Sequence, residues 1–147
     1  MARVLVTGAT GFIGSHVARL LAQRGHEVTL AVERGSPDQA IADLDLRRLT
    51  CDVRDRRSVR RVLSGIERVF HCAGVTSVRP ADEQRLFDVN VGGTKIVMEE
   101  CLRAEVERVV YTSSAAVVGP ARQGKTADEG QLFTAGRLGI PYVNSVH

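Results

Sequence analysis

The chain has 147 residues, which suits a single domain, and its 44% hydrophobic and 25% charged residues are typical of a globular protein. No apolar run approaches the roughly 20 residues that span a bilayer, and the first residues lack the pattern of a secretory signal, so we expect a cytoplasmic protein without a membrane partner. The formal net charge is +3, but aromatic residues make up only 4% of the chain and offer few platforms for stacked bases, so we expect no nucleic-acid partner.

Short runs rich in β-branched residues alternate with stretches of helical periodicity along the chain. The strand-like runs cover residues 3–8, 27–32, 46–52, 68–74 and 107–114. Between them apolar residues recur at helical spacing, as in Phe12, Ile13, Val17, Leu20 and Leu21. This alternation requires crossover connections and predicts a doubly wound parallel sheet of the α/β class, formed by one domain over residues 1–147.

The glycine-rich stretch "VLVTGATGFIGSHVARLL" links the first predicted strand to the first predicted helix. Gly8 permits a tight turn, Gly11 lets the backbone approach a diphosphate, and Gly14 lets helix and strand pack closely. The helix N-terminus adds free N–H groups and the positive end of its dipole. An ordinary strand-to-helix turn is the alternative, but this context favours a dinucleotide site that also includes Thr7, Phe12 and Ile13.

The basic stretch 54–61 is the densest in the chain. Val59, Val62 and Leu63 fall at helical spacing there, which predicts an amphipathic helix whose arginines face solvent. Binding of a phosphate backbone is the alternative.

The three cysteines, Cys51, Cys72 and Cys101, lie far apart in apolar segments, which favours buried reduced thiols over a disulfide or a metal site.

The spacing G-x-x-G-x-x-G after Thr7 and the string "TGATGFIGSH" resemble the extended branch of the short-chain dehydrogenase/reductase superfamily. This branch contains nucleotide-sugar epimerases and dehydratases and dihydroflavonol-reductase-like enzymes, and the resemblance runs from Val4 to Tyr142. It implies a Rossmann fold that binds NAD or NADP and acts on a small-molecule substrate, a nucleotide sugar or a related hydroxy or keto compound. A non-catalytic dinucleotide binder or an inactive fragment is the alternative.

Glu33 follows the second predicted strand, 19 residues beyond Gly14. A carboxylate there can accept hydrogen bonds from an adenosine ribose and would repel the 2′-phosphate of NADP, so NAD is the expected cofactor. Arg34 could instead bind that phosphate, which makes NADP the alternative. Either residue alone is equally consistent with an exposed turn.

The resemblance places further residues beside the cofactor. Asp52 and the backbone at Val53 correspond to positions that meet the adenine ring. Asn90 is unfavourable within a helix and is expected to make a specific hydrogen bond with a structural role. His71 is expected to be a packed strand-end residue, and the small residues that follow it leave room for the cofactor: Cys72, Ala73 and Gly74.

The segment "YTSSAAVVG" ends the fifth predicted strand. By resemblance, Ser114 is the serine that hydrogen-bonds the reacting oxygen, and the neighbouring Ser113 is expected to face the opposite way. A serine that satisfies the backbone at a strand end is the alternative. Tyr142 matches the family's proton-exchanging tyrosine.

A free phenol has a pKa near 10 and is a poor base at neutral pH. The family lowers that pKa with a lysine four residues further on, but this chain has Val146 there, and His147 is one position too far round the helix. The sequence thus predicts a catalytic-looking pair without its activating cation. We also expect the sheet to stop after about the fifth strand and the substrate domain to be absent. The sequence does not determine the oligomeric state, but a homodimer is what the resemblance implies, because relatives commonly dimerise through helices that include the predicted long one at 83–105.

Overall fold

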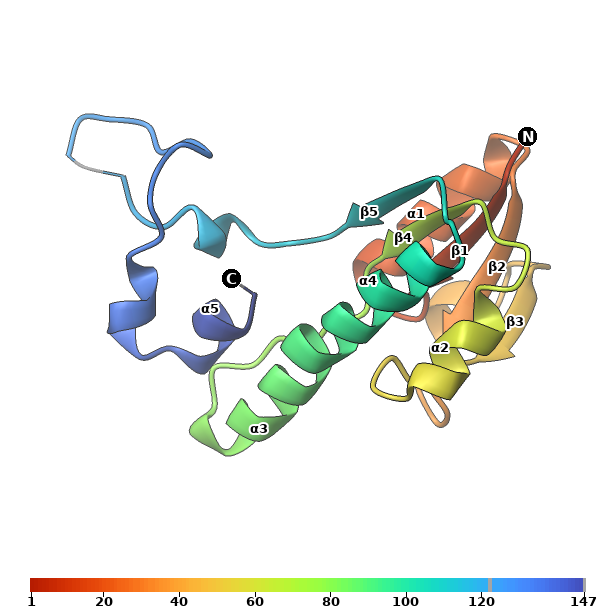
Figure 1. Cartoon of the computed structure of the whole chain (residues 1–147), viewed down its shortest axis with the longest axis horizontal. Coiled ribbons are helices and arrows are strands. Elements are labelled where there is room, and N and C mark those ends of the chain that lie inside the picture. Colours follow the sequence, from red (N-terminus) through yellow and green to blue (C-terminus); the bar gives the residue numbers. More distant parts are fainter. Residues whose placement is uncertain (122, 147) are drawn as a thin grey trace.

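The computed structural model describes residues 1–121 and 123–146 and contains one parallel sheet flanked by helices (Figure 1). The sheet order is β3-β2-β1-β4-β5, and every neighbouring pair of strands is parallel. The strands are β1 (Arg3–Thr7), β2 (Glu27–Val32), β3 (Arg47–Thr50), β4 (Arg68–His71) and β5 (Arg108–Tyr111). The predicted doubly wound parallel sheet is confirmed.

The helices occupy the crossovers between the strands. They are α1 (Phe12–Gln23), α2 (Arg56–Val62), α3 (Glu83–Leu86), α4 (Thr94–Arg103) and, after β5, α5 (Pro141–Val146). Residues Phe87–Gly93 are π-helical and join α3 and α4 into one long helix, which runs from green at α3 to teal at α4 in Figure 1. The segment between β2 and β3 contains only a 3-10 turn, Gln39–Ile41, whose Ile41 is fully buried.

Two separate apolar layers cover the two faces of the sheet. Val4 and Val6 point to one face and pack with residues of α1, while Leu5 between them points to the other face. That second face packs against α2 and α4 through Val59 and Val97. The alternation along β1 thus accounts for helices on both sides of the sheet.

A buried carboxylate joins α2 to α4. Glu100 is only 1% exposed and pairs with Arg56 at 2.7 Å, Arg60 at 2.8 Å and Arg103 at 3.0 Å; Arg56 also pairs with Glu99. Hydrogen bonds from Arg60 and Arg56 lower the pKa of Glu100 to about 2. The predicted amphipathic helix is confirmed, but two of its arginines bind this carboxylate instead of facing only solvent.

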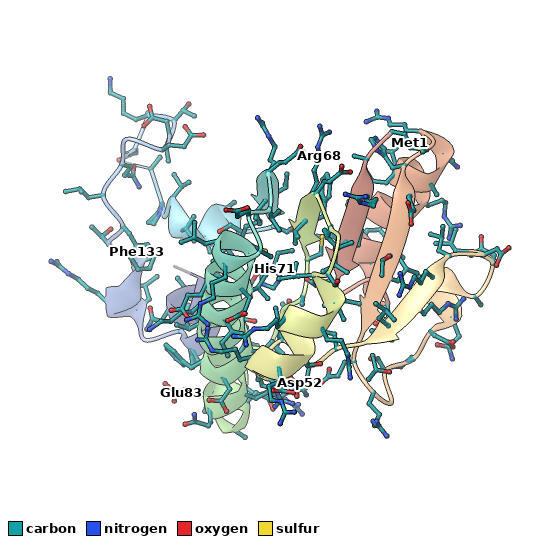
Figure 2. The ribbon with its side chains drawn as sticks, turned by 45° about the vertical axis from the view of Figure 1, so that its right-hand side comes forward. Met1, Asp52, Arg68, His71, Glu83 and Phe133 are labelled. Atoms are coloured by element: carbon teal, nitrogen blue, oxygen red, sulfur yellow. The ribbon has the colours of Figure 1, made fainter. Side chains whose placement is uncertain are left out.

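The chain changes direction in the sheet between β1 and β4. From β1 it proceeds to β2 and β3, and then returns past β1 to form β4 and β5. Such a point opens a crevice at the carboxyl ends of the two central strands. In Figure 2, Met1 and Arg68 lie at one end of the sheet, whereas His71 and Asp52 lie toward the other, where the candidate site is found.

The residues after β5 extend away from the sheet before α5 returns toward the long helix (Figure 1). The described part of this stretch contains the 3-10 turns Ala115–Val117 and Ala135–Leu138 and no strand. Leu132 is 84% exposed and Leu138 is 65% exposed. No helix in the described part of the chain combines the length and apolar character needed to cross a bilayer.

Candidate functional site

The glycine loop brings the end of β1 against the end of β4. Gly8 has a φ of +64°, and a Cβ there would lie 2.6 Å from the backbone N of Ala73, so no larger residue fits without a shift. A Cβ on Gly14 would lie 2.2 Å from the carbonyl oxygen of Gly8. Gly8 therefore lets the loop lie against the chain after β4, and Gly14 lets α1 lie against the loop. The outer side of the loop is open to solvent at Gly11.

The N-terminus of α1 is exposed to this open side. Gly11 is its N-cap and provides no side-chain acceptor, and the first turn contains no acidic residue. The first N–H groups of the helix are thus left without a side-chain partner, and the positive end of the dipole is not neutralised. This arrangement suits a bound anion such as a diphosphate.

A cavity of about 190 Å³ begins at this loop and runs across the carboxyl ends of β1, β2 and β3. Nine of the residues predicted to bind cofactor line it: Thr7, Gly8, Gly11, Glu33, Asp52, Val53, Cys72, Ala73 and Gly74. The lining also contains residues that the sequence did not single out, among them Thr10, Ser36, Arg54 and Arg85. Segments that are far apart in sequence therefore form one wall.

Arg54 links the two acidic residues of this cavity. Its Nε and Nη2 donate to the two carboxylate oxygens of Asp52 at 2.9 and 2.8 Å, and Nη2 lies 3.5 Å from Oε1 of Glu33. The hydrogen bonds from Arg54 lower the pKa of Asp52. Asp52 therefore remains ionised at neutral pH, as an acceptor in the wall of the cavity.

His71 lies behind the cavity and ties three elements together. It is fully buried, its Nδ1 lies 2.7 Å from Thr7 Oγ1, and its Nε2 lies 3.0 Å from Thr94 Oγ1. Thr7 Oγ1 also accepts a hydrogen bond from the backbone N of Ala73. Burial lowers the pKa of His71 to about 4, so the ring is neutral near pH 7. This agrees with the predicted role as a packed strand-end residue.

A second cavity, of about 120 Å³, adjoins the first at the loop after β4. Tyr142 and Val146 line it from α5, and Ser113 lines it from the end of β5. The wall of this cavity also contains two other predicted residues, Ile13 and Asn90. It shares three predicted residues with the first cavity: Cys72, Ala73 and Gly74. The predicted tyrosine and the unexpected valine therefore face the same space.

Ser114 is placed differently from Ser113. Its Oγ accepts a hydrogen bond from the backbone N of Ala116 at 3.2 Å and caps the 3-10 turn Ala115–Val117. Within residues 1–121 and 123–146, the lining of the second cavity contains Ser113 and not Ser114. The catalytic roles of Ser114 and Tyr142 thus stay predictions, and His147 lies outside the described residues.

Asn90 makes the specific hydrogen bonds that its position in a helix predicts. Its Oδ1 accepts from the backbone N of Val75 at 2.8 Å, and its Nδ2 donates to Val75 O at 3.0 Å and to Ser145 Oγ at 2.9 Å. Ser145 Oγ in turn donates to the carbonyl oxygen of Tyr142. Asn90 therefore connects the π-helical segment to the loop after β4 and to the helix that carries Tyr142.

Three other predicted residues lie outside both cavity linings in the described structure: Phe12, Gly14 and Arg34. Gly14 acts through packing, and Phe12 and Arg34 are exposed. Arg54 is the main residue of the site that the sequence did not predict. The available signal was its place between Asp52 and Asp55 directly after the third strand, which set it apart from the helix that follows.

Comparison with known proteins places this geometry in a family context. Residues 4–137 match the family described as NAD dependent epimerase/dehydratase. The sterol demethylase protein B of Methylococcus capsulatus is 48% identical over 120 residues, covering 82% of this chain and 37% of that protein. The 3 beta-hydroxysteroid dehydrogenase/Delta 5-->4-isomerase of Mycobacterium tuberculosis is 36% identical over 140 residues, covering 91% of this chain and 37% of that protein.

Among solved structures, the UDP-glucose 4-epimerase of Thermus thermophilus in complex with NAD superimposes with a TM-score of 0.84 at 31% identity. The match covers 98% of this chain and 47% of that one. The chain therefore spans less than half the length of these relatives.

Proposed function

The chain belongs to the NAD-dependent epimerase/dehydratase family, and we propose that it binds NAD as the cofactor portion of an oxidoreductase, epimerase or dehydratase. The observation that carries this proposal is the cavity that joins the glycine loop to Glu33 and Asp52. The free N–H groups at the start of α1 would hold the diphosphate. Glu33 would accept hydrogen bonds from the adenosine ribose.

The second cavity supports a redox role for the other half of the dinucleotide. NAD, when bound, supplies a hydride acceptor, and NADH a donor. Tyr142 would hold or donate a proton at the substrate oxygen, with Ser114 or its neighbour Ser113 as the hydrogen-bonding partner. Val146 supplies no cation to favour the phenolate, so this chain is better suited to proton donation, the direction of ketone reduction, than to proton abstraction.

The substrate proposal follows from the relatives. The greater identity, 48%, is with a protein named for sterol demethylation, and a second relative is named a hydroxysteroid dehydrogenase. We infer that a hydroxyl or ketone carbon of a sterol is the first substrate to test. Nucleotide sugars are the second, because the NAD-bound structural relative is a UDP-glucose 4-epimerase.

Calorimetric titration of NAD into the 147-residue chain tests the cofactor proposal. Gly11→Asp is a matched variant: aspartate is a good N-cap, so the fold should be kept, but its charge lies where the diphosphate is expected. We expect saturable binding to the unaltered chain and at least about tenfold weaker binding to the variant, since like-charge repulsion near a protein surface costs more than about 1.4 kcal/mol at this range. Equal affinities, or no saturable binding by the unaltered chain, would contradict the proposal.

A further inference from the structure

Arg54 lines the first cavity and forms ion pairs with both of its acidic residues, Glu33 and Asp52. Its guanidinium is hydrogen-bonded to both oxygens of Asp52, and the same Nη2 that bonds Asp52 lies 3.5 Å from the Glu33 carboxylate. The side chains of Arg54 and Glu33 are 44% and 55% exposed, so they can be reached from solvent. The fork of one arginine thus spans the two acidic residues.

NAD and NADP differ only by a phosphate on the adenosine ribose. If Glu33 accepts hydrogen bonds from that ribose, a 2′-phosphate would lie within reach of the guanidinium that already approaches Glu33. Arginine is the side chain best shaped for a phosphate, because its planar fork can donate two parallel hydrogen bonds. Two carboxylates compete with the phosphate for this fork in the present chain.

We propose that Arg54 is a specificity residue for the dinucleotide: Asp52 holds its guanidinium in place, Glu33 competes for its Nη2 and favours NAD, and loss of the Glu33 charge lets the same guanidinium bind the 2′-phosphate of NADP. This inference rests on the proposed function, because it requires that the cavity binds a dinucleotide. It extends that function by giving Glu33 a second effect. Besides repelling a phosphate directly, Glu33 competes with the phosphate for the guanidinium of Arg54.

Arg34, which follows Glu33 in the sequence, is the other arginine that could bind a 2′-phosphate. It is exposed, and in the described structure it is not part of the cavity lining, whereas Arg54 is. Arg85 also lines the cavity, but no ion pair to Glu33 or Asp52 is found for it among the described residues. Arg34→Gln therefore provides a charge-matched control for Arg54→Gln.

The experiment measures the ratio of NADP to NAD affinity by calorimetry in four forms of the chain: unaltered, Glu33→Gln, Glu33→Gln/Arg54→Gln and Glu33→Gln/Arg34→Gln. Using the ratio cancels any general weakening of the site. We expect Glu33→Gln to raise the ratio about tenfold or more, in line with one charge-assisted phosphate contact. Adding Arg54→Gln should remove most of that gain, and adding Arg34→Gln should leave it. The gain should also shrink as salt is raised from about 0.05 to 0.5 M.

The results separate this inference from the proposed function. NAD binding to the unaltered chain with a ratio that depends on Arg54 supports both. The inference is overturned, and the function left intact, if NAD binds but the rise in the NADP-to-NAD affinity ratio persists when Arg54→Gln is added. The same holds if that rise disappears when Arg34→Gln is added. Absence of NAD binding by the unaltered chain overturns both. Circular dichroism of each variant verifies the fold, and Arg54→Lys, which keeps the charge but loses the fork, should retain only part of the gain.

Discussion

The two cavities are built from regions of very different packing. Residues 1–111 form two complete apolar layers around the sheet, and the first cavity lies entirely within this region. Residues 112–146 supply Ser113 and Tyr142 from 3-10 turns, irregular chain and one six-residue helix. In the described part of that region Ala135 is the only hydrophobic residue that is buried, while Leu132 and Leu138 are largely exposed.

This difference in packing bears differently on the two proposed functions, dinucleotide binding and proton transfer. A dinucleotide site needs rigid backbone at the ends of several strands, and the sheet provides it. A site for proton transfer needs side chains held within fractions of an ångström by the surrounding packing, and the second region provides less of that support. We therefore expect cofactor binding to be robust, and the geometry around Tyr142 to be the weaker part.

Matched leucine truncations give the largest expected contrast. Leu30 is fully buried in the layer beneath α1, and Leu30→Ala should lower the free energy of unfolding by about 3 kcal/mol through lost burial and a cavity. Leu132→Ala, in the second region, should change it by less than about 0.5 kcal/mol. Urea denaturation followed by circular dichroism measures both. Similar losses for the two variants would show that the second region is packed as tightly as the first.

The pH dependence of stability tests the buried histidine between the sheet and α4. His71 has a pKa of about 4 in the folded chain, against about 6.5 when unfolded, so the unfolded chain takes up this proton first as the pH falls. Stability should therefore fall between pH 6.5 and pH 4, with about 2 kcal/mol lost from pH 7 to pH 5. Glu100, whose pKa is lowered to about 2, should add a further loss only below about pH 4.5.

Urea denaturation at a series of pH values measures this effect. His71→Gln should flatten the profile between pH 7 and pH 5, and His16→Gln, which replaces an exposed histidine of α1, is the control substitution. The same slope in all three proteins would contradict a neutral, buried His71.

A charge placed beside Tyr142 gives the smallest expected effect and tests the second region directly. Val146→Lys puts a cation one helical turn from Tyr142, facing the same cavity, and should raise the phenolate fraction near pH 9 roughly three- to tenfold. Tyrosinate absorbance measures this in a Tyr111→Phe background, since Tyr111 is the only other tyrosine and the chain has no tryptophan.

Val143→Lys is the matched control for this measurement. It adds the same charge on α5 but one residue from Tyr142, about 100° round the helix, and should have the smaller effect. If both lysines act equally, α5 does not hold Tyr142 and residue 146 toward the same cavity.

The sequence predicted the parts of the molecule that local chemistry determines. The spacing of Gly8, Gly11 and Gly14 reflects backbone contacts within a few residues or across neighbouring strands, and alternation along β1 reflects burial on both faces. The helical position of Asn90 implied a specific hydrogen bond, although its partners Val75 and Ser145 could not be identified without the fold.

Contacts between segments that are distant in the chain could not be predicted from the sequence. Arg54 belongs to a run of charged residues whose simplest interpretation was a solvated helix face. Its ion pair with Glu33 arises because β2 and β3 are neighbours and end at the same edge of the sheet. The burial of Glu100 likewise depends on the packing of α2 against α4. The resemblance pointed to Ser114 as the serine nearer the reacting oxygen, whereas Ser113 is the serine that shares the second cavity with Tyr142.

The most direct test of a complete dinucleotide site in the first region is an amide NMR titration of the 147-residue chain with NAD. We predict saturable shifts at the amides that line the first cavity, above all those of Gly8, Gly11, Glu33 and Arg54. Saturation without shifts at the glycine loop, or no saturable shifts at all, would contradict the account.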